Sequence, residues 1–127
     1  MIDKEMEIFE AVAFTLRNKF KSIFVYGVEL SDMPPKFPAV SFVQTNNATN
    51  TAYATFDRLE NVVKEEYKAE VYSNLSKGKE AQTKEIIKLL SEVMAGFGYE
   101  RTFCEMVPNG DSTISRRIAR FRKQNVI

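Results

Sequence analysis

The chain has 127 residues, of which 44% are hydrophobic, so it has the length of one domain and enough apolar side chains for one core. Its 18 Lys and Arg nearly balance its 17 Asp and Glu, and this net charge of +1 argues against a general binder of polyanions. It has no histidine and one cysteine, Cys104, which excludes Ser-His-Asp and Cys-His catalysis, imidazole zinc sites and an internal disulfide. We therefore expect a single domain over residues 1–127.

The beginning of the chain predicts an amphipathic helix over about residues 4–20. Its acidic opening, MIDKEMEIFE, lacks the basic and apolar regions of a secretory signal, and no apolar run approaches the roughly 18 residues of a membrane span. We expect a soluble protein made inside the cell, with no membrane partner. Apolar residues recur at spacings of four and three, which lays them on one helical face: Ile2, Met6, Phe9, Ala13, Leu16 and Phe20.

Two strands, each followed by a loop, are predicted next. SIFVYGVEL (22–30) and AVSFVQT (39–45) are rich in β-branched and aromatic residues, which favours strands. SDMPPKFP between them predicts a loop, because proline has no N–H donor for a sheet, and the polar stretch beginning NNATN predicts a loop or hairpin tip. Loops over 31–38 and 46–60 are long for a small domain and are candidate binding loops, with candidate residues Pro34, Pro35, Asn46, Asn47 and Asn50.

The clearest strand pattern is NVVKEEYKAEVYS (61–73). Val63, Tyr67 and Val71 share one parity with Glu65, while charged residues of alternating sign occupy the other parity. Apart from Glu65, this pattern predicts an apolar face toward the core and a solvated charged face that attracts no ligand.

The second half of the chain predicts a helix and a hairpin. KEAQTKEIIKLLSEVMAGF (79–97) carries a broad apolar stripe, and Gly96 and Gly98 indicate its end. YERTFCEMV (99–107) predicts a strand, and VPNGDST predicts a turn that leads into a returning strand. The whole order predicts an α+β domain, with a mostly antiparallel sheet of four to five strands and two helices on one side, arranged α-β-β-β-α-β-β.

The segment ISRRIARFRK (114–123) concentrates basic residues near the end of an otherwise balanced chain. As a helix it would present Ile114, Ile118 and Phe121 as one stripe. The preceding turn favours a strand, which places Arg117 on the face opposite its neighbouring arginines. Such guanidinium groups can pair with Glu100, Glu105 or Asp111 across the hairpin, or with another subunit. The candidate interface or channel-lining residues are Arg116, Arg117, Arg120, Arg122 and Lys123.

No pattern in the sequence indicates an enzyme, a cofactor or a metal. Glu65 and Glu66 are consecutive, so in a strand they point to opposite faces and cannot act as a catalytic pair. LSKGKEAQ places glycine and lysine before a helix, but it lacks the second glycine and the spacing of a phosphate-binding loop. The prediction is a protein without catalytic activity.

The chain from about Pro38 onward resembles the tail-completion proteins of long-tailed bacteriophages, which include tail terminators and the neck proteins that join head to tail. The matching features are the strand ending EVYSN, the Lys-Gly-Lys opening of a helix, the segment GFGYER after it, the turn VPNGDST and the arginine strand ISRRIARF. KFPAVSF, with its proline before a strand, also fits. No single feature is specific, and the resemblance rests on their order.

This resemblance implies a virion subunit, assembled in the host cytoplasm, that forms a homo-oligomeric ring, usually a hexamer, at the head-proximal end of the tail. The ring stops polymerisation of the tail tube and joins the tube to the head–tail connector proteins, and DNA passes through it without sequence-specific contact. The acidic first helix and the arginine segment are then complementary patches for neighbouring subunits. The alternative is a small nucleic-acid-binding or regulatory domain that uses the arginine segment.

Overall fold

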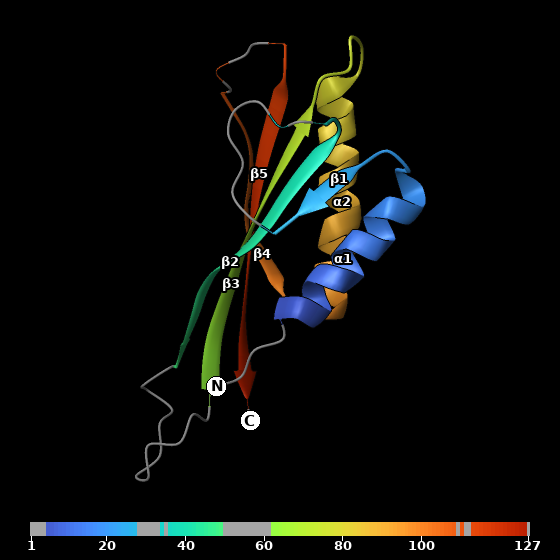
Figure 1. Ribbon diagram of the computed structural model, residues 1–127. Helices are drawn as coiled ribbons and strands as arrows, with labels where there is room; N and C mark the ends of the chain where they lie inside the picture. Colours follow the sequence, from blue (N-terminus) through green and yellow to red (C-terminus); the bar gives the residue numbers. More distant parts are fainter. Residues whose placement is uncertain are drawn as a thin grey trace, which may run out of the picture.

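The computed structural model describes residues 5–27, 34, 36–49, 62–108, 110 and 113–126. Seven elements follow one another in the predicted order α-β-β-β-α-β-β, which confirms the α+β class (Figure 1). They are α1 (Glu5–Lys19), β1 (Phe24–Tyr26), β2 (Ala39–Thr49), β3 (Val62–Ser73), α2 (Lys79–Gly96), β4 (Glu100–Val107) and β5 (Ser115–Val126).

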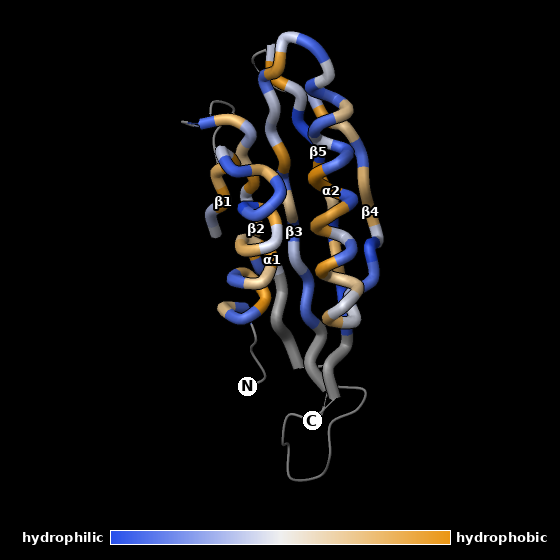
Figure 2. Tube along the Cα trace, turned by 90° about the vertical axis from the view of Figure 1, so that its right-hand side faces the viewer, coloured by the Kyte–Doolittle hydropathy of each residue, from blue (hydrophilic) through white to orange (hydrophobic). Residues whose placement is uncertain are grey.

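The five strands form one sheet in the order β1-β2-β3-β5-β4. β1 pairs with β2 in parallel, and the three other pairs of neighbours are antiparallel. Both helices lie on the same face of the sheet, α1 over β1 and β2, and α2 over β3 and β5 (Figure 2). We call the other side the open face, because none of the described residues forms a helix there.

The main core lies between the helices and the sheet, because alternate residues of each strand point toward the helices. On β3 these are Tyr67, Ala69 and Val71, whose exposed fractions are 1% or less. The predicted stripe of the second helix is confirmed: its central members are fully buried and its flanking members pack against the same cluster. The fully buried apolar helix residues are Ile8, Val12, Leu16, Ile86, Ile87, Leu90 and Met94.

The C-terminal end of α2 positions a core tyrosine. Gly98 adopts a φ of 87°, a left-handed conformation that favours glycine. This lets the N–H of Gly98 bond to the carbonyl of Ala95 and the N–H of Tyr99 bond to that of Met94, each at 2.9 Å. These two bonds are the Schellman pattern of a helix end. The turn directs the chain back under α2, where Tyr99 is buried.

The predicted stripe of the first helix was partly wrong. Met6 is 72% exposed, whereas Ile8 and Val12, which the prediction left out, are buried with Leu16. Ile8, Val12 and Leu16 are spaced by four residues, so they form a second helical face next to the predicted one. Two overlapping apolar stripes exist in this helix, and packing on the sheet selects between them. Ile2 lies outside the described residues.

The predicted loop after β2 was also wrong at its start, because Asn46 and Asn47 belong to the strand. They pair with Glu66 and Glu65 of β3, after a shift in register between Gln44 and Asn46. Continued backbone pairing along β3 outweighs the low strand propensity of asparagine, and the irregularity lets the ladder resume.

The other loop candidates are only partly described. Pro34 is buried. The predicted loop 31–38 is described only at residues 34 and 36–38, where the peptide bond before Pro38 is cis. Pro35 and Asn50 lie outside the described residues.

Truncation of Leu90 tests the core between α2 and the sheet. We expect Leu90→Ala to lower the free energy of unfolding by about 2–5 kcal/mol, because it removes buried methyl groups and leaves a cavity. Urea denaturation followed by circular dichroism measures this change. Leu75→Ala is the matched control, because Leu75 is 43% exposed, and its cost should stay near 0.5 kcal/mol. Equal costs for the two variants would contradict the described core.

Candidate functional site

The arginine segment forms β5, an interior strand between β3 and β4, so the strand interpretation is confirmed and the helical alternative is wrong. The predicted hairpin is also confirmed, since β4 and β5 pair antiparallel across the turn region. Because β5 has a paired strand on each side, its backbone groups are used within the sheet. Any interaction with another molecule must come from its side chains.

The two faces of β5 separate the five basic candidates. Arg117 and Lys123 have the same parity as Ala119 and Phe121, which are buried beneath the helices. The remaining three have the opposite parity and lie on the open face: Arg116, Arg120 and Arg122. The candidates therefore do not form one continuous basic patch.

Both basic side chains on the helix face have partners within the chain. The Nζ of Lys123 donates a hydrogen bond to the carbonyl oxygen of Phe97, which ends α2, and it lies 5.6 Å from the centre of the Tyr99 ring. A cation at this position offsets the partial negative charge of a helix C-terminus. Arg117 Nε approaches Thr83 Oγ1 of α2 at 3.5 Å, a weak contact. These residues connect β5 to α2.

Glu65 is fully buried on the helix face and is held by Tyr99, whose hydroxyl donates to Glu65 Oε2. The Tyr99 ring also packs edge-on against Tyr67, with 5.3 Å between centroids. Burial and the Glu65 carboxylate both raise the pKa of Tyr99 above its ordinary value. The sequence marked Glu65 as the exception in an apolar row but did not identify Tyr99 as its partner.

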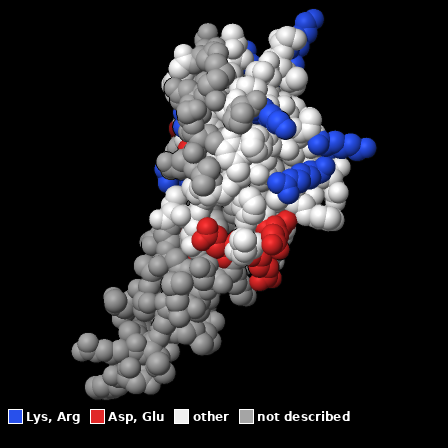
Figure 3. All heavy atoms as spheres, in the orientation of Figure 1, with Lys and Arg blue, Asp and Glu red and all other residues white. Residues whose placement is uncertain are grey.

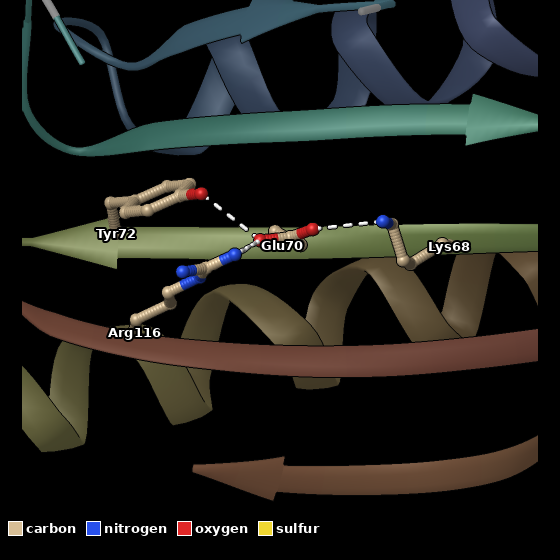
Figure 4. A network of polar contacts seen from close by, with 4 residues as sticks. All are labelled: Lys68, Glu70, Tyr72 and Arg116. Atoms are coloured by element: carbon tan, nitrogen blue, oxygen red, sulfur yellow. Dashed lines mark hydrogen bonds and ion pairs between the residues drawn. The ribbon is translucent and has the colours of Figure 1, made fainter. Parts of the chain in front are cut away.

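The open face of β3 carries a second buried carboxylate, Glu70, which is only 4% exposed. Arg116 Nε donates to Glu70 Oε2 at 2.8 Å, Tyr72 donates its hydroxyl to the same oxygen at 3.0 Å, and Lys68 Nζ lies 3.0 Å from Oε1 (Figure 4). The Arg116 guanidinium also lies 5.4 Å from the Tyr72 ring centre. Arg116, alone among the three open-face arginines, is therefore part of a partly buried network.

This network corrects the predicted solvated face of β3. The alternation of apolar and charged side chains along β3 was predicted, but the prediction that its charged face is solvated was wrong. β3 lies between β2 and β5, whose side chains shield this face on both sides. Tyr72 and Ser73 are fully buried at the end of the same strand. Arg116 has a partner on β3, Glu70, where the prediction considered partners across the β4–β5 hairpin, and Asp111 lies outside the described residues.

The pKa of Glu70 reflects competing effects. Burial alone raises the pKa of this carboxyl group, but hydrogen bonds from Arg116, Lys68 and Tyr72 together outweigh burial and hold it below the ordinary value of 4.5. The folded protein therefore favours the ionised form of Glu70.

Arg120 and Arg122 are exposed, and in the described part of the chain no carboxylate forms an ion pair with either of them. They sit among charges of both signs, because cross-strand partners share a face and Arg122 lies opposite both Glu66 and Glu100. The described charged side chains of the open face on β3, β4 and β5 are Lys68, Arg116, Arg120 and Arg122 against Glu66, Glu70, Glu100 and Glu105, four of each sign.

Strand β4 forms one edge of the sheet and is mostly exposed on both faces. Phe103, opposite Arg120, is 36% exposed on the open face, and Met106 is 50% exposed on the helix face. The site is thus a charge-balanced surface with an aromatic residue at its edge. Balanced charge gives little attraction to a phosphate backbone, whereas a mosaic of both signs suits recognition of another protein surface.

Other site types find no support in the described residues. They contain no group of three or more Cys, Asp or Glu side chains that could hold a metal ion. Cys104 is half-buried and packs against the main core. Neither described helix is long and apolar enough to cross a membrane. Comparison of the sequence with protein-family models gives no match, and a search of curated proteins gives none.

The Glu70 network predicts acid sensitivity. Because the folded-state pKa of Glu70 is depressed, ionised Glu70 contributes stability above the ordinary pKa of about 4.5, and this contribution is lost as pH falls through the folded-state value. We expect Glu70→Gln to lower the free energy of unfolding by about 1–3 kcal/mol at pH 7. The difference in free energy of unfolding between this variant and wild type should become smaller below about pH 4. Urea denaturation between pH 3 and pH 7 measures both quantities.

Glu105→Gln is the matched control, because Glu105 is exposed on the same face of the sheet. It should follow the wild-type pH profile throughout. A constant difference between Glu70→Gln and wild type at every pH would contradict the assigned direction of the pKa shift.

Proposed function

We propose that this protein is a structural subunit of a virion, similar to the tail-completion proteins of long-tailed bacteriophages, and has no catalytic activity. It assembles in the host cytoplasm into a ring, usually six copies in that family, at the head-proximal end of the tail. There it stops polymerisation of the tail tube and joins the tube to the connector proteins of the head. The observation that carries the proposal is the balance of charge among the described side chains of the open face, which the exposed edge strand β4 borders.

A surface of this kind suits a specific protein contact. Arg122 lies opposite Glu66 and Glu100, whereas Arg120 lies opposite Lys68 and Phe103. A partner must therefore present its own charges in the matching order, and like charges in the wrong order repel. Arg120, Arg122 and Phe103 supply the side-chain types that protein interfaces favour, guanidinium and aromatic groups. The open face therefore selects charged groups of the tube or connector by their pattern and not by their total charge.

The same surface supports passage of DNA without retention. A protein that holds duplex DNA neutralises several phosphates with a row of basic side chains. On the open face, Glu66 and Glu100 lie directly beside Arg122, which reduces the local positive potential. Such a face gives DNA no continuous basic track.

A nucleic-acid-binding function has fewer basic side chains available to contact phosphates than the sequence suggested. Arg116 is engaged by Glu70, Arg117 contacts Thr83, and Lys123 contacts the end of α2. Only two of the five basic candidates remain exposed without a partner in the described part of the chain. We therefore favour the assembly function.

Native mass spectrometry of the purified chain over a range of concentrations tests the ring. We expect a discrete closed oligomer, with six copies as the expected number, because head-to-tail contacts close through rotation and give a fixed stoichiometry. A broad ladder without a preferred size, or a monomer at every concentration, would contradict a closed ring.

The double variant Arg120→Glu/Arg122→Glu separates the two functions. We expect it to fold normally and to abolish joining of tail tubes to heads in an in vitro assembly assay, because it reverses the charge at both exposed arginines and Arg122→Glu also puts a like charge beside Glu66 and Glu100. Fluorescence anisotropy with a 20-base-pair duplex at 100 mM salt should show negligible binding for wild type and variant alike.

Lys21→Glu/Lys77→Glu is the control, since it makes the same change of charge at two exposed positions outside the open face. It should support normal joining. Duplex binding by the wild type that weakens steeply with salt and disappears in Arg120→Glu/Arg122→Glu would favour the nucleic-acid function instead.

A further inference from the structure

The outer side of α1 exposes large apolar side chains that the open face does not explain. Phe14 is 68% exposed and Met6 is 72% exposed. Glu7, Glu10 and Phe14 follow one another at spacings of three and four, so they lie along one stripe of the helix, and Met6 flanks it. Large exposed apolar side chains next to two carboxylates make this side of α1 a candidate contact surface.

The basic residues of α1 are engaged elsewhere, which leaves this stripe acidic. Arg17 donates through Nη2 to the carbonyl of Val25 in β1 at 3.4 Å, and Lys19 Nζ lies 3.2 Å from Glu85 Oε1 of α2. Figure 3 shows the resulting polarity, with acidic side chains gathered where α1 begins and basic ones where it ends. We call Met6, Glu7, Glu10 and Phe14 the α1 knob.

A groove of about 390 Å³ lies on the far side of α2, between this helix and the hairpin strands. Its floor is formed by the rings of Tyr99 and Phe121, and its helical wall is formed by the small side chains of Ser91 and Ala95. Small residues above aromatic rings leave room for an inserted apolar group. We call this hollow the α2–β4 groove.

Charged groups at the α2–β4 groove complement those of the α1 knob. Lys88 and Arg101 are exposed at the groove and Glu92 is the one carboxylate among its lining residues, so the lining is net positive. On the α1 knob, Glu7 and Glu10 lie next to Phe14, on its N-terminal side. The arginines of β5 at positions 116, 120 and 122 are on the other face of the sheet and do not contribute to this groove.

The α1 knob and the α2–β4 groove are placed at opposite edges of the same layer. α1 covers β1 and β2 at one edge of the sheet, and the groove lies beyond α2 next to β4 at the other edge (Figure 2). Two different complementary patches on opposite edges form a heterologous contact, which repeats from copy to copy and closes a ring when the rotation allows.

We propose that the α1 knob of one copy docks in the α2–β4 groove of a second copy, with Phe14 seated above Tyr99 and Phe121. Glu10 then faces Arg101 of the neighbour, and Glu7 faces Lys88. This contact rests on the proposed ring and specifies which surfaces form it. The open face of the sheet stays available for the tube and the connector proteins.

Sedimentation velocity of the full chain tests the contact with two variants that alter only exposed residues. Phe14→Ser removes the inserted ring, and Ala95→Arg fills the groove with a longer side chain. We expect each to weaken self-association at least tenfold while leaving the circular dichroism spectrum unchanged. Leu75→Ser is the matched control, because it removes an exposed apolar side chain outside both surfaces, and its self-association should equal that of wild type.

Charge exchange gives a readout that a merely structural role would not produce. Glu10→Arg and Arg101→Glu should each weaken self-association, since each places like charges across the contact. The two changes combined in one chain should restore it toward the wild-type level, because every copy then carries the exchanged pair. Additive weakening in the double variant would overturn the proposed pairing of these charges.

Disulfide trapping distinguishes this contact from a symmetric one. In a Cys104→Ser background, one chain carries Phe14→Cys and a second chain carries Ala95→Cys. Oxidation of the mixture should give a cross-linked pair that contains one chain of each kind. Cross-linking of the Phe14→Cys chain with itself as the main product would show that α1 meets α1, and would overturn the proposal.

The outcomes separate this inference from the proposed function. An oligomer that persists in both Phe14→Ser and Ala95→Arg would overturn the docking contact. The proposed ring would then form through other surfaces. A wild-type chain that stays monomeric at every concentration would overturn both the contact and the self-assembled ring. Loss of self-association in both variants, with recovery in the charge exchange, would support the contact.

Discussion

Strand β3 buries one carboxylate on each of its faces, and the arrangement around it depends on hydrogen-bond donors reaching both. A buried carboxylate without donors is strongly unfavourable, so each requires a partner from another part of the chain. Glu65, beneath the helices, receives the hydroxyl of Tyr99, which the turn at Gly98 places under α2. Glu70, on the open face, receives Arg116 from β5 together with Tyr72 and Lys68 from its own strand. The two networks connect β3 to the hairpin on both sides of the sheet.

This constraint divides the basic residues of β5 by task. Arg116 balances a buried charge, and Lys123 meets the carbonyl that ends α2, so both stabilise the fold. Arg120 and Arg122 lie on the same open face, beyond Ile118, which is the residue opposite Glu70, and they remain exposed. A segment that is continuous in the sequence thus supplies contacts within the fold at both ends and an external surface between them. Counting its arginines overstates the charge that another molecule would meet.

The molecule therefore presents two kinds of outer surface. The open face offers charges of both signs in a fixed order, with β4 exposed at its border. The helix layer offers the α1 knob at one edge and the α2–β4 groove at the other. On the proposed function, separate surfaces would let one copy contact its neighbours within a ring and other proteins of the tail. An extended sheet held by helices on a single side provides this separation, because its second face is left uncovered.

The sequence by itself determined the element order and the apolar stripe of α2, and it favoured a strand over 114–123, because periodicity and turn residues act locally along the chain. It also marked Glu65 as an anomaly in an apolar row. Only the tertiary structure decided which stripe of α1 is buried, that Asn46 and Asn47 extend β2, and that Glu70 is shielded by neighbouring strands. The physical reason is that these outcomes depend on strand order, register and packing between segments far apart in the chain. The separation of Arg116 from Arg120 and Arg122 follows from the same cause, since only the placement of β5 beside β3 brings Arg116 to Glu70.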